Sequence, residues 1–126
     1  MSYAERHVVS ITTDADGNGT GYTPVVTGKV QTIRYIKPAS GGYADTVDFT
    51  ITADASGESV LAVSNVTASA TYAPRQATCT TAGAASLYAD GGAAVNDGIV
   101  LANDRVKIVV AQGGDTRSGT FHVVIA

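Results

Sequence analysis

The chain has 126 residues, which is enough for one domain with a single core. Its formal net charge is −3 and its eight basic residues are scattered, so the sequence lacks the clustered positive charge of a nucleic-acid-binding domain. Its single cysteine, Cys79, excludes an intramolecular disulfide and a structural zinc site built from several cysteines.

The balance of residue types predicts an all-β protein. Val and Ile together number 23 against 3 Leu, and 16 Thr stand beside only 2 Glu and 3 Lys. Branched side chains fit a pleated sheet, whereas most strong helix formers are scarce. No apolar run approaches the ~20 residues of a spanning helix, and no signal peptide is recognised. We therefore expect a protein that matures in a cytoplasm and does not enter a membrane.

The N-terminal half predicts three strands in chain order. Residues 1–7 are polar and are expected to form a loose arm, with Tyr3 able to anchor it on a neighbour. A first strand over residues 8–13 is followed by a turn rich in Asp-Gly and Asn-Gly signals. The remaining two strands cover residues 27–37, which end at a proline, and residues 47–52, which alternate apolar and polar side chains.

The middle of the chain predicts short strands and then a long irregular segment. Residues 59–63 and 65–72 are read as two short strands or one bulged strand. Residues 73–97 are rich in Ala, Gly and Thr and predict a long loop, which in a small domain is usually functional or only locally ordered. A further strand is expected at residues 98–102.

The last segment, residues 105–126, predicts one long antiparallel hairpin. Symmetric folding about its Gly-rich turn sets Val110 opposite Phe121 and Ile108 opposite Val123, so that one face is wholly apolar. The other face is half apolar, which places the hairpin centrally rather than at an edge. About eight short strands in total predict a single antiparallel β-sandwich over residues 1–126, jelly-roll-like, with a C-terminal β-hairpin.

One motif resembles part of a calcium-binding loop. Asp14, Asp16 and Asn18 match the first half of an EF-hand loop, but Val25 stands where the twelfth-position Glu should chelate the ion. A hairpin loop made of Asx turns is the favoured interpretation, and occasional binding of Ca²⁺ at the surface is left open.

No group of residues predicts catalysis. His7 and His122 are distant in sequence, Cys79 has no evident activating partner, and no Gly-x-Ser-x-Gly elbow occurs. Asp45 and Asp48 are the one close pair of carboxylates, and their place beside a strand favours a solvated edge. We expect a protein that is not an enzyme and that needs no cofactor or metal.

Several stretches of the chain form a pattern that is similar to a known family. They are residues 11–17, 26–36, 74–78, 81–84, 101–114 and 118–123. Through these stretches, which span most of the chain, it resembles a family of small virion structural proteins of tailed bacteriophages. Cys79 departs from the resemblance, because it stands where a polar residue or His is expected.

The resemblance implies a minor capsid, or decoration, protein on the outside of the phage head. The expected partner is the major capsid protein, and a trimer at a three-fold position would match the lattice. The expected contact elements are the N-terminal arm, the loop at residues 74–97 and the tip at residues 113–119. The side chains expected at the interface are Tyr3, Pro74, Arg75, Leu87, Tyr88 and Arg117.

Two alternatives stay open at this point. The first is a neck, head-to-tail or tail-associated protein of the same family, present in few copies. The second is a carbohydrate-binding β-sandwich, although sugar sites usually stack rings on Trp or Tyr and this chain has no Trp.

Overall fold

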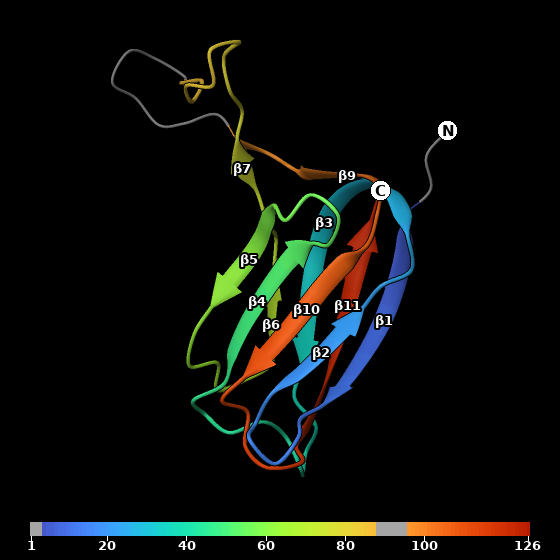
Figure 1. Ribbon diagram of the computed structural model, residues 1–126, viewed down its shortest axis with the longest axis vertical. Coiled ribbons are helices and arrows are strands. Elements are labelled where there is room, and N and C mark those ends of the chain that lie inside the picture. The colour runs from blue at the N-terminus through green and yellow to red at the C-terminus, as the bar shows by residue number, and fades with distance from the viewer. Residues whose placement is uncertain (1–3, 88–95) are drawn as a thin grey trace.

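The computed structural model describes residues 4–87 and 96–126, and its regular structure there is entirely β-strand. None of the described segments forms a helix that could cross a membrane. Figure 1 shows the strands packed as two layers, with one loop-bearing end raised above them. The strands are β1 (Glu5–Thr12), β2 (Gly19–Tyr22), β3 (Val26–Ile36), β4 (Asp48–Ala53), β5 (Ser59–Val63), β6 (Ala70–Tyr72), β7 (Gln76–Ala77), β8 (Asn96–Asp97), β9 (Ile99–Asp104), β10 (Val106–Ala111) and β11 (Ser118–Ile125).

The two layers have the strand order of a jelly roll. One sheet runs β1-β11-β3-β6, with β9 also paired to β3, and the other runs β2-β10-β4-β5. Among the strands of the two layers, β1 pairs with β11, β2 with β10, β3 with β6 and β4 with β5, all antiparallel. This pairing is what results when one long antiparallel ribbon is wound into two Greek keys. The predicted all-β sandwich of about eight strands is confirmed, and β9 is an addition to it.

The predicted C-terminal hairpin is wrong. β10 pairs with β2 and β4 in one sheet, whereas β11 pairs with β1 and β3 in the other. Both strands are central, as their half-apolar outer faces predicted, but their apolar faces meet across the core instead of side by side. Alternation reports which face of a strand is buried and carries no information about the neighbouring strand.

The connection between β10 and β11, residues 112–117, crosses from one sheet to the other. Gln112, Gly114 and Thr116 all have positive φ, at 58°, 88° and 49°, so this segment coils instead of closing a two-residue turn. Thr13 holds it in place, because its Oγ1 donates to the carbonyl of Gly114 over 2.6 Å and accepts from the N–H of Arg117 over 2.9 Å.

β2 lies inside the segment that the sequence predicted to be a turn. An ideal Cβ at Gly19 would lie 2.7 Å from a methyl carbon of Ile11, and one at Gly21 would lie 2.7 Å from a methyl carbon of Val9. The side chains of β1 therefore fill the space on the inner face of β2, which closes this side of the sandwich. Glycines in place of apolar residues removed the alternation by which strands are recognised.

Two predicted irregular segments contain paired strands. β1 begins at Glu5, so the last residues of the expected loose arm are bonded to β11, with Glu5 opposite Ile125 and His7 opposite Val123. The long loop predicted at residues 73–97 contains β7 and β8, which pair with each other. Residues 1–3 and 88–95 lie outside the described residues.

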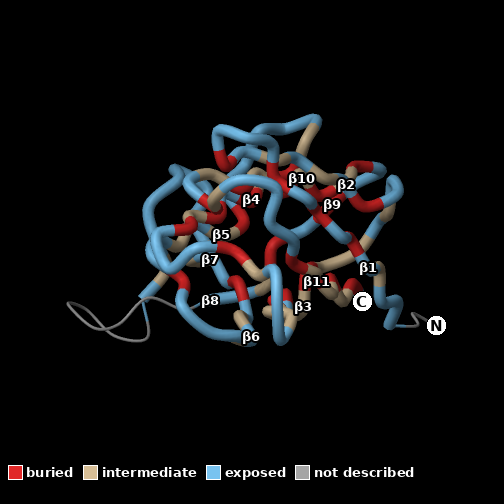
Figure 2. Tube along the Cα trace, turned by 90° about the horizontal axis from the view of Figure 1, so that it is seen from below, coloured by how far each residue is buried: buried red, intermediate tan, exposed pale blue. Residues whose placement is uncertain are grey.

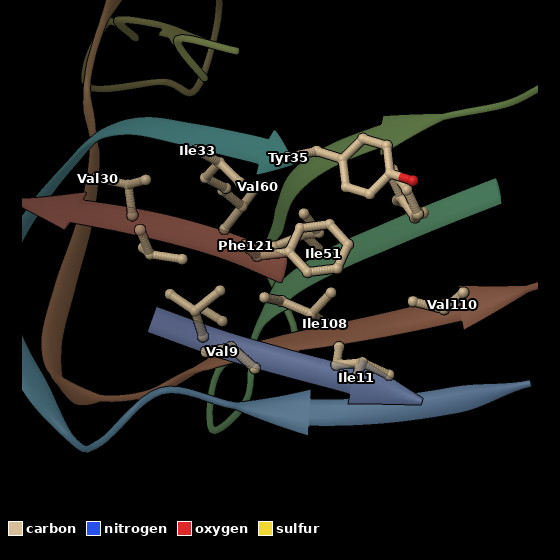
Figure 3. Packing of buried hydrophobic residues seen from close by; sticks show 14 of the residues in the cluster. Val9, Ile11, Val30, Ile33, Tyr35, Ile51, Val60, Ile108, Val110 and Phe121 are labelled. Atoms are coloured by element: carbon tan, nitrogen blue, oxygen red, sulfur yellow. The ribbon is translucent and has the colours of Figure 1, made fainter. Parts of the chain in front are cut away.

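The core between the sheets is built from branched aliphatic side chains around one aromatic cluster (Figures 2 and 3). Phe49 of β4 packs against Tyr35 of β3 and Phe121 of β11, with ring centroids 4.8 and 4.9 Å apart. Tyr43 completes the cluster from the β3–β4 connection, 5.9 Å from Phe49. These edge-to-face contacts join the two sheets, and each contributes about 0.5–1.5 kcal/mol beyond its buried area.

The two tyrosines of the cluster differ in the fate of their hydroxyl groups. Tyr43 Oη donates to the carbonyl of Ile11 over 2.6 Å, whereas the buried Tyr35 Oη finds no partner among the described residues. Burial raises the pKa of Tyr35 to about 12 and raises the pKa of Tyr43 further. Both hydroxyls therefore stay protonated at neutral pH. Only the Tyr43 hydroxyl replaces its lost hydrogen bonds to water with a hydrogen bond inside the protein.

This difference predicts unequal effects on stability for two chemically identical substitutions. Tyr43→Phe removes a buried hydrogen bond and should lower the free energy of unfolding by about 1 kcal/mol. Tyr35→Phe removes an uncompensated polar group and should leave the free energy of unfolding unchanged or raise it. Urea unfolding of both variants beside the parent chain measures the difference, and an equal loss in the two would contradict the assignment.

Candidate interaction surface

The segment after β6 forms a small ordered projection at one end of the sandwich (Figure 1). At its base Gln76 pairs with Asp97 and Ala77 with Asn96. Further out, the N–H of Thr80 donates to the carbonyl of Ala84 over 2.7 Å. The N–H of Ser86 also donates to the carbonyl of Thr78 over 2.7 Å, so residues 78–86 fold back on themselves as a hairpin, although they contain few large apolar side chains.

An ion pair ties the base of this projection to β3. Lys29 Nζ lies 3.1 Å from Asp97 Oδ2, and the N–H of Gly98 donates to Asp97 Oδ1 over 2.7 Å. The hydrogen bond from Gly98 and then the contact with Lys29 lower the pKa of Asp97. The carboxylate thus stays charged at neutral pH, and its contacts join the base of the projection to β3.

A shallow depression opens beside this base, between the projection and the start of β5. Its volume is about 380 Å³, and its walls include Glu58, Gln76, Cys79 and Val100. The exposed Cys79 thiol lies 3.6 Å from the carbonyl of Ala77. The lining includes two carboxylates, those of Glu58 and Asp97, together with an amide, a thiol and an aliphatic side chain. Across the described part of the chain no three His, Cys, Asp or Glu residues are placed to hold a metal ion.

Arg75, which the sequence placed at an interface, has a structural contact within its own chain. β3 pairs with β9 through residues 26–30 and with β6 through residues 33–35, and Gln31 lies in the gap between these partners. The guanidinium of Arg75 donates to the carbonyl of Gln31 over 3.1 Å and to that of Pro74 over 2.7 Å. Arg75 thereby gives the carbonyl of Gln31 a hydrogen-bond donor at a point where β3 is paired with neither β6 nor β9.

The other expected interface residues do not form one patch. Pro74 is buried within its own chain, Leu87 is 45% exposed on the projection, and Arg117 is exposed at the opposite end of the sandwich. Tyr3 and Tyr88 lie outside the described residues. The projection and the crossing connection at residues 112–117 are thus two separate surfaces.

The Asp-rich turn before β2 is an Asx turn, as favoured from the sequence. Asp14 Oδ1 accepts the backbone N–H groups of Asp16 and Asn18 over 2.9 and 3.0 Å. The carbonyl of Asp14 accepts the N–H of Thr116, so the turn also braces the crossing connection. This carboxylate therefore has a structural role in shaping one end of the sandwich.

The candidate acid and base residues are engaged separately. Asp48 Oδ1 accepts the N–H of Asn65 over 3.1 Å, and Asp45 Oδ1 lies 3.5 Å from Lys37 Nζ. His7 Nε2 lies 3.2 Å from Glu5 Oε2, a contact that sequence reasoning missed. Its signal was available, because residues two apart in a strand share a face.

His122 lies on the outer face of its sheet, in register with Val8 on β1 and Arg34 on β3.

Arg105, one of the basic residues near the C-terminal strands, has contacts of its own. Arg105 covers the ring of Tyr22 at 3.9 Å from its centroid and donates from Nε to Asp54 over 2.8 Å. One face of this exposed tyrosine is therefore occupied by a cation and not by solvent.

One stretch of the chain carries almost no charge, a feature that sequence reasoning did not use. The chain has eight Lys and Arg and eleven Asp and Glu, yet between residues 59 and 87 only Arg75 is charged. Most of these residues are exposed, and they make up β5, β6 and the projection, which lie on one side of the sandwich in Figures 1 and 2. Charged side chains of neighbouring elements border this stretch, since Arg34 donates to Thr71 and Lys37 to the carbonyl of Thr67. Depletion of charge marks the centre of protein–protein interfaces, so the surface formed by residues 59–87, called the neutral side below, is the candidate interaction surface.

No family model matches the chain, and no curated protein matches it. A solved structure described as the crystal structure of FlhE is similar over 98% of each chain, with 11% sequence identity and a TM-score of 0.46.

Asp104 orients the turn that leads into the neutral side. Its Oδ1 accepts the N–H groups of Ala55 and Arg105 over 2.8 and 2.7 Å, and the hydrogen bond from Ala55 is the largest of the contacts that lower the pKa of Asp104. A carboxyl whose pKa is lowered by folding adds stability above its unfolded pKa, and this stability is lost as the pH falls through the folded pKa.

We therefore expect Asp104→Asn to weaken the acid dependence of stability. The variant should melt at a lower temperature than the parent near pH 7, and the two should converge as the pH falls below 3.8 and through the lowered folded pKa of Asp104, where the parent carboxyl becomes protonated. Thermal unfolding across this range measures the effect. Melting curves that stay equally far apart at both ends would refute a role for the Asp104 charge.

Proposed function

We propose that this chain is a structural protein of a tailed-bacteriophage particle, and specifically a decoration protein that binds the outside of the head. The resemblance of its sequence to small virion proteins supports the proposal. A jelly-roll sandwich is also a recurrent architecture of viral shells, a fold-level analogy that raises the expectation without deciding it.

The observation that carries the proposal is the projection that extends from one end of the sandwich. Its base is held by the β7–β8 pair and by the ion pair between Lys29 and Asp97, while its outer residues are exposed and uncharged. Such an element can lie across a neighbouring subunit and bury neutral surface there. A protein that binds only the assembled shell stabilises it by mass action, because the unassembled subunits offer no site.

The expected partner is the major capsid protein, with copies of this chain at three-fold positions of the lattice. A neck, head-to-tail or tail-associated role in the same particle is the alternative, and it differs chiefly in copy number. A carbohydrate-binding role has weaker support, since Arg105 already covers one face of the exposed Tyr22 ring.

Counting copies in purified particles tests the proposal. We expect one copy per major capsid subunit, or a simple lattice fraction of that number, by quantitative mass spectrometry. Roughly six to twelve copies per particle would replace the decoration role by one at the neck or tail. Absence of the protein from particles would overturn the structural role altogether.

A second test addresses the projection. Deleting residues 82–95 keeps the β7 and β8 segments, so the sandwich should keep its melting temperature while occupancy on heads falls at least about tenfold. A Gly/Ser segment of equal length at the same position is the matched control, since it keeps the length and removes the native side chains. Full occupancy by the deleted chain would show that other residues make the contact.

A further inference from the structure

β5 is a free edge of the sandwich within the part of the chain that the structure describes. It ends the strand order β2-β10-β4-β5, and β4 is its paired neighbour. In Figure 1 it forms one margin of the molecule. A sheet edge presents unpaired N–H and C=O groups to any strand that approaches, so natural proteins usually protect it.

The edges at β1, β2 and β6 are protected, whereas β5 is guarded only by a register shift in its pairing with β4, between Ile51 and Thr52. β1 and β2 close against each other through Gly19 and Gly21, and β6 has only three residues. β5 has five residues, Ser-Val-Leu-Ala-Val, with no charge and no proline. Residues 64–74, which follow it, are uncharged as well. The strand thus lacks the lysines, prolines and inward charges that keep edges apart.

The hydrogen-bond alternation shows which groups of β5 face outward. The N–H of Ala53 donates to the carbonyl of Glu58 over 2.9 Å, immediately beyond the pair Thr52 and Ser59. Thr52 and Ser59 therefore exchange no backbone hydrogen bonds with each other. Hydrogen-bonded and non-hydrogen-bonded pairs alternate along β4, so Thr50 and Ala62, two residues further on, are also a non-hydrogen-bonded pair. The N–H and C=O of Ala62 consequently point away from β4, toward the free edge.

We propose that β5 pairs antiparallel with β5 of a second copy of this chain, about a two-fold axis at Ala62. The two Ala62 residues would exchange two backbone hydrogen bonds and join two four-stranded sheets into one of eight strands. A second copy is the occupant that these observations favour, because a two-fold axis sets a neutral strip against an identical neutral strip. The small exposed side chain at the centre allows the close approach.

This pairing does not depend on where the protein sits in a particle, so its test is independent of the proposed function. Sedimentation of the purified chain should show a dimer at about 100 μM, as expected for a small interface. Ala62→Pro removes the outward N–H without taking a bond from β4, and Ala62→Lys sets two like charges together. Each should raise the dissociation constant at least about tenfold while circular dichroism and melting stay close to the parent.

The matched control is Thr50→Lys. Thr50 is exposed, lies opposite Ala62 on the adjacent strand and belongs to the same outer face, so the variant adds the same charge one strand further from the axis. It should remain dimeric. Retention of the oligomer by both Ala62 variants would overturn the proposal, as would a parent chain that sediments as a monomer at this concentration.

Crosslinking provides a second measurement that does not rely on a variant being destabilised. In a Cys79→Ser background, Ala62→Cys would place two thiols on residues whose Cα atoms are about 5.5 Å apart, within the range of a disulfide. Thr50→Cys would leave its Cα atoms about 14 Å apart, across three strand spacings. Rapid oxidation to a dimer with the first and not with the second supports the pairing, and equal rates would refute it.

Discussion

The packing of β10 against β11 across the core is the constraint on which the rest of the fold depends. Ile108 and Val110 on one strand and Phe121 and Val123 on the other are completely buried, and each strand is the centre of its own sheet. Since the two strands are consecutive in the chain, residues 112–117 must cross between the layers. The turn before β2 then braces this crossing, and the first two strands are held beside the last two.

The sequence predicts the strands well where side chains alternate. β4, β5 and β11 all lie close to their expected positions, because one inward face of each carries Val, Ile or Phe. β2 could not be recognised because glycines occupy its inward positions, where Ile11 and Val9 leave no room. Pairing could not be predicted either, since an apolar face is equally satisfied by a neighbour in its own sheet or by one across the core.

The candidate surface was only partly predictable, for a different physical reason. The loop at residues 73–97 was singled out by its composition, but its order depends on contacts distant in sequence, such as that between Lys29 and Asp97. Arg75 suggested a surface contact, whereas it bonds the carbonyl of Gln31 in a gap that only the sheet pairing creates. The neutral side is visible in the sequence as missing charge, and its meaning depends on β5 being an edge.

The pairing of the first strand with the last also has a consequence for how the chain reaches its native state. Ser10 and Thr120 meet in the sheet although 110 positions separate them, and most sandwich pairs join distant segments in the same way. Such topologies fold slowly because long loops must close before their contacts stabilise them. During synthesis β1 has no paired strand until β11 has left the ribosome, so the nascent chain is exposed to aggregation until that strand is made.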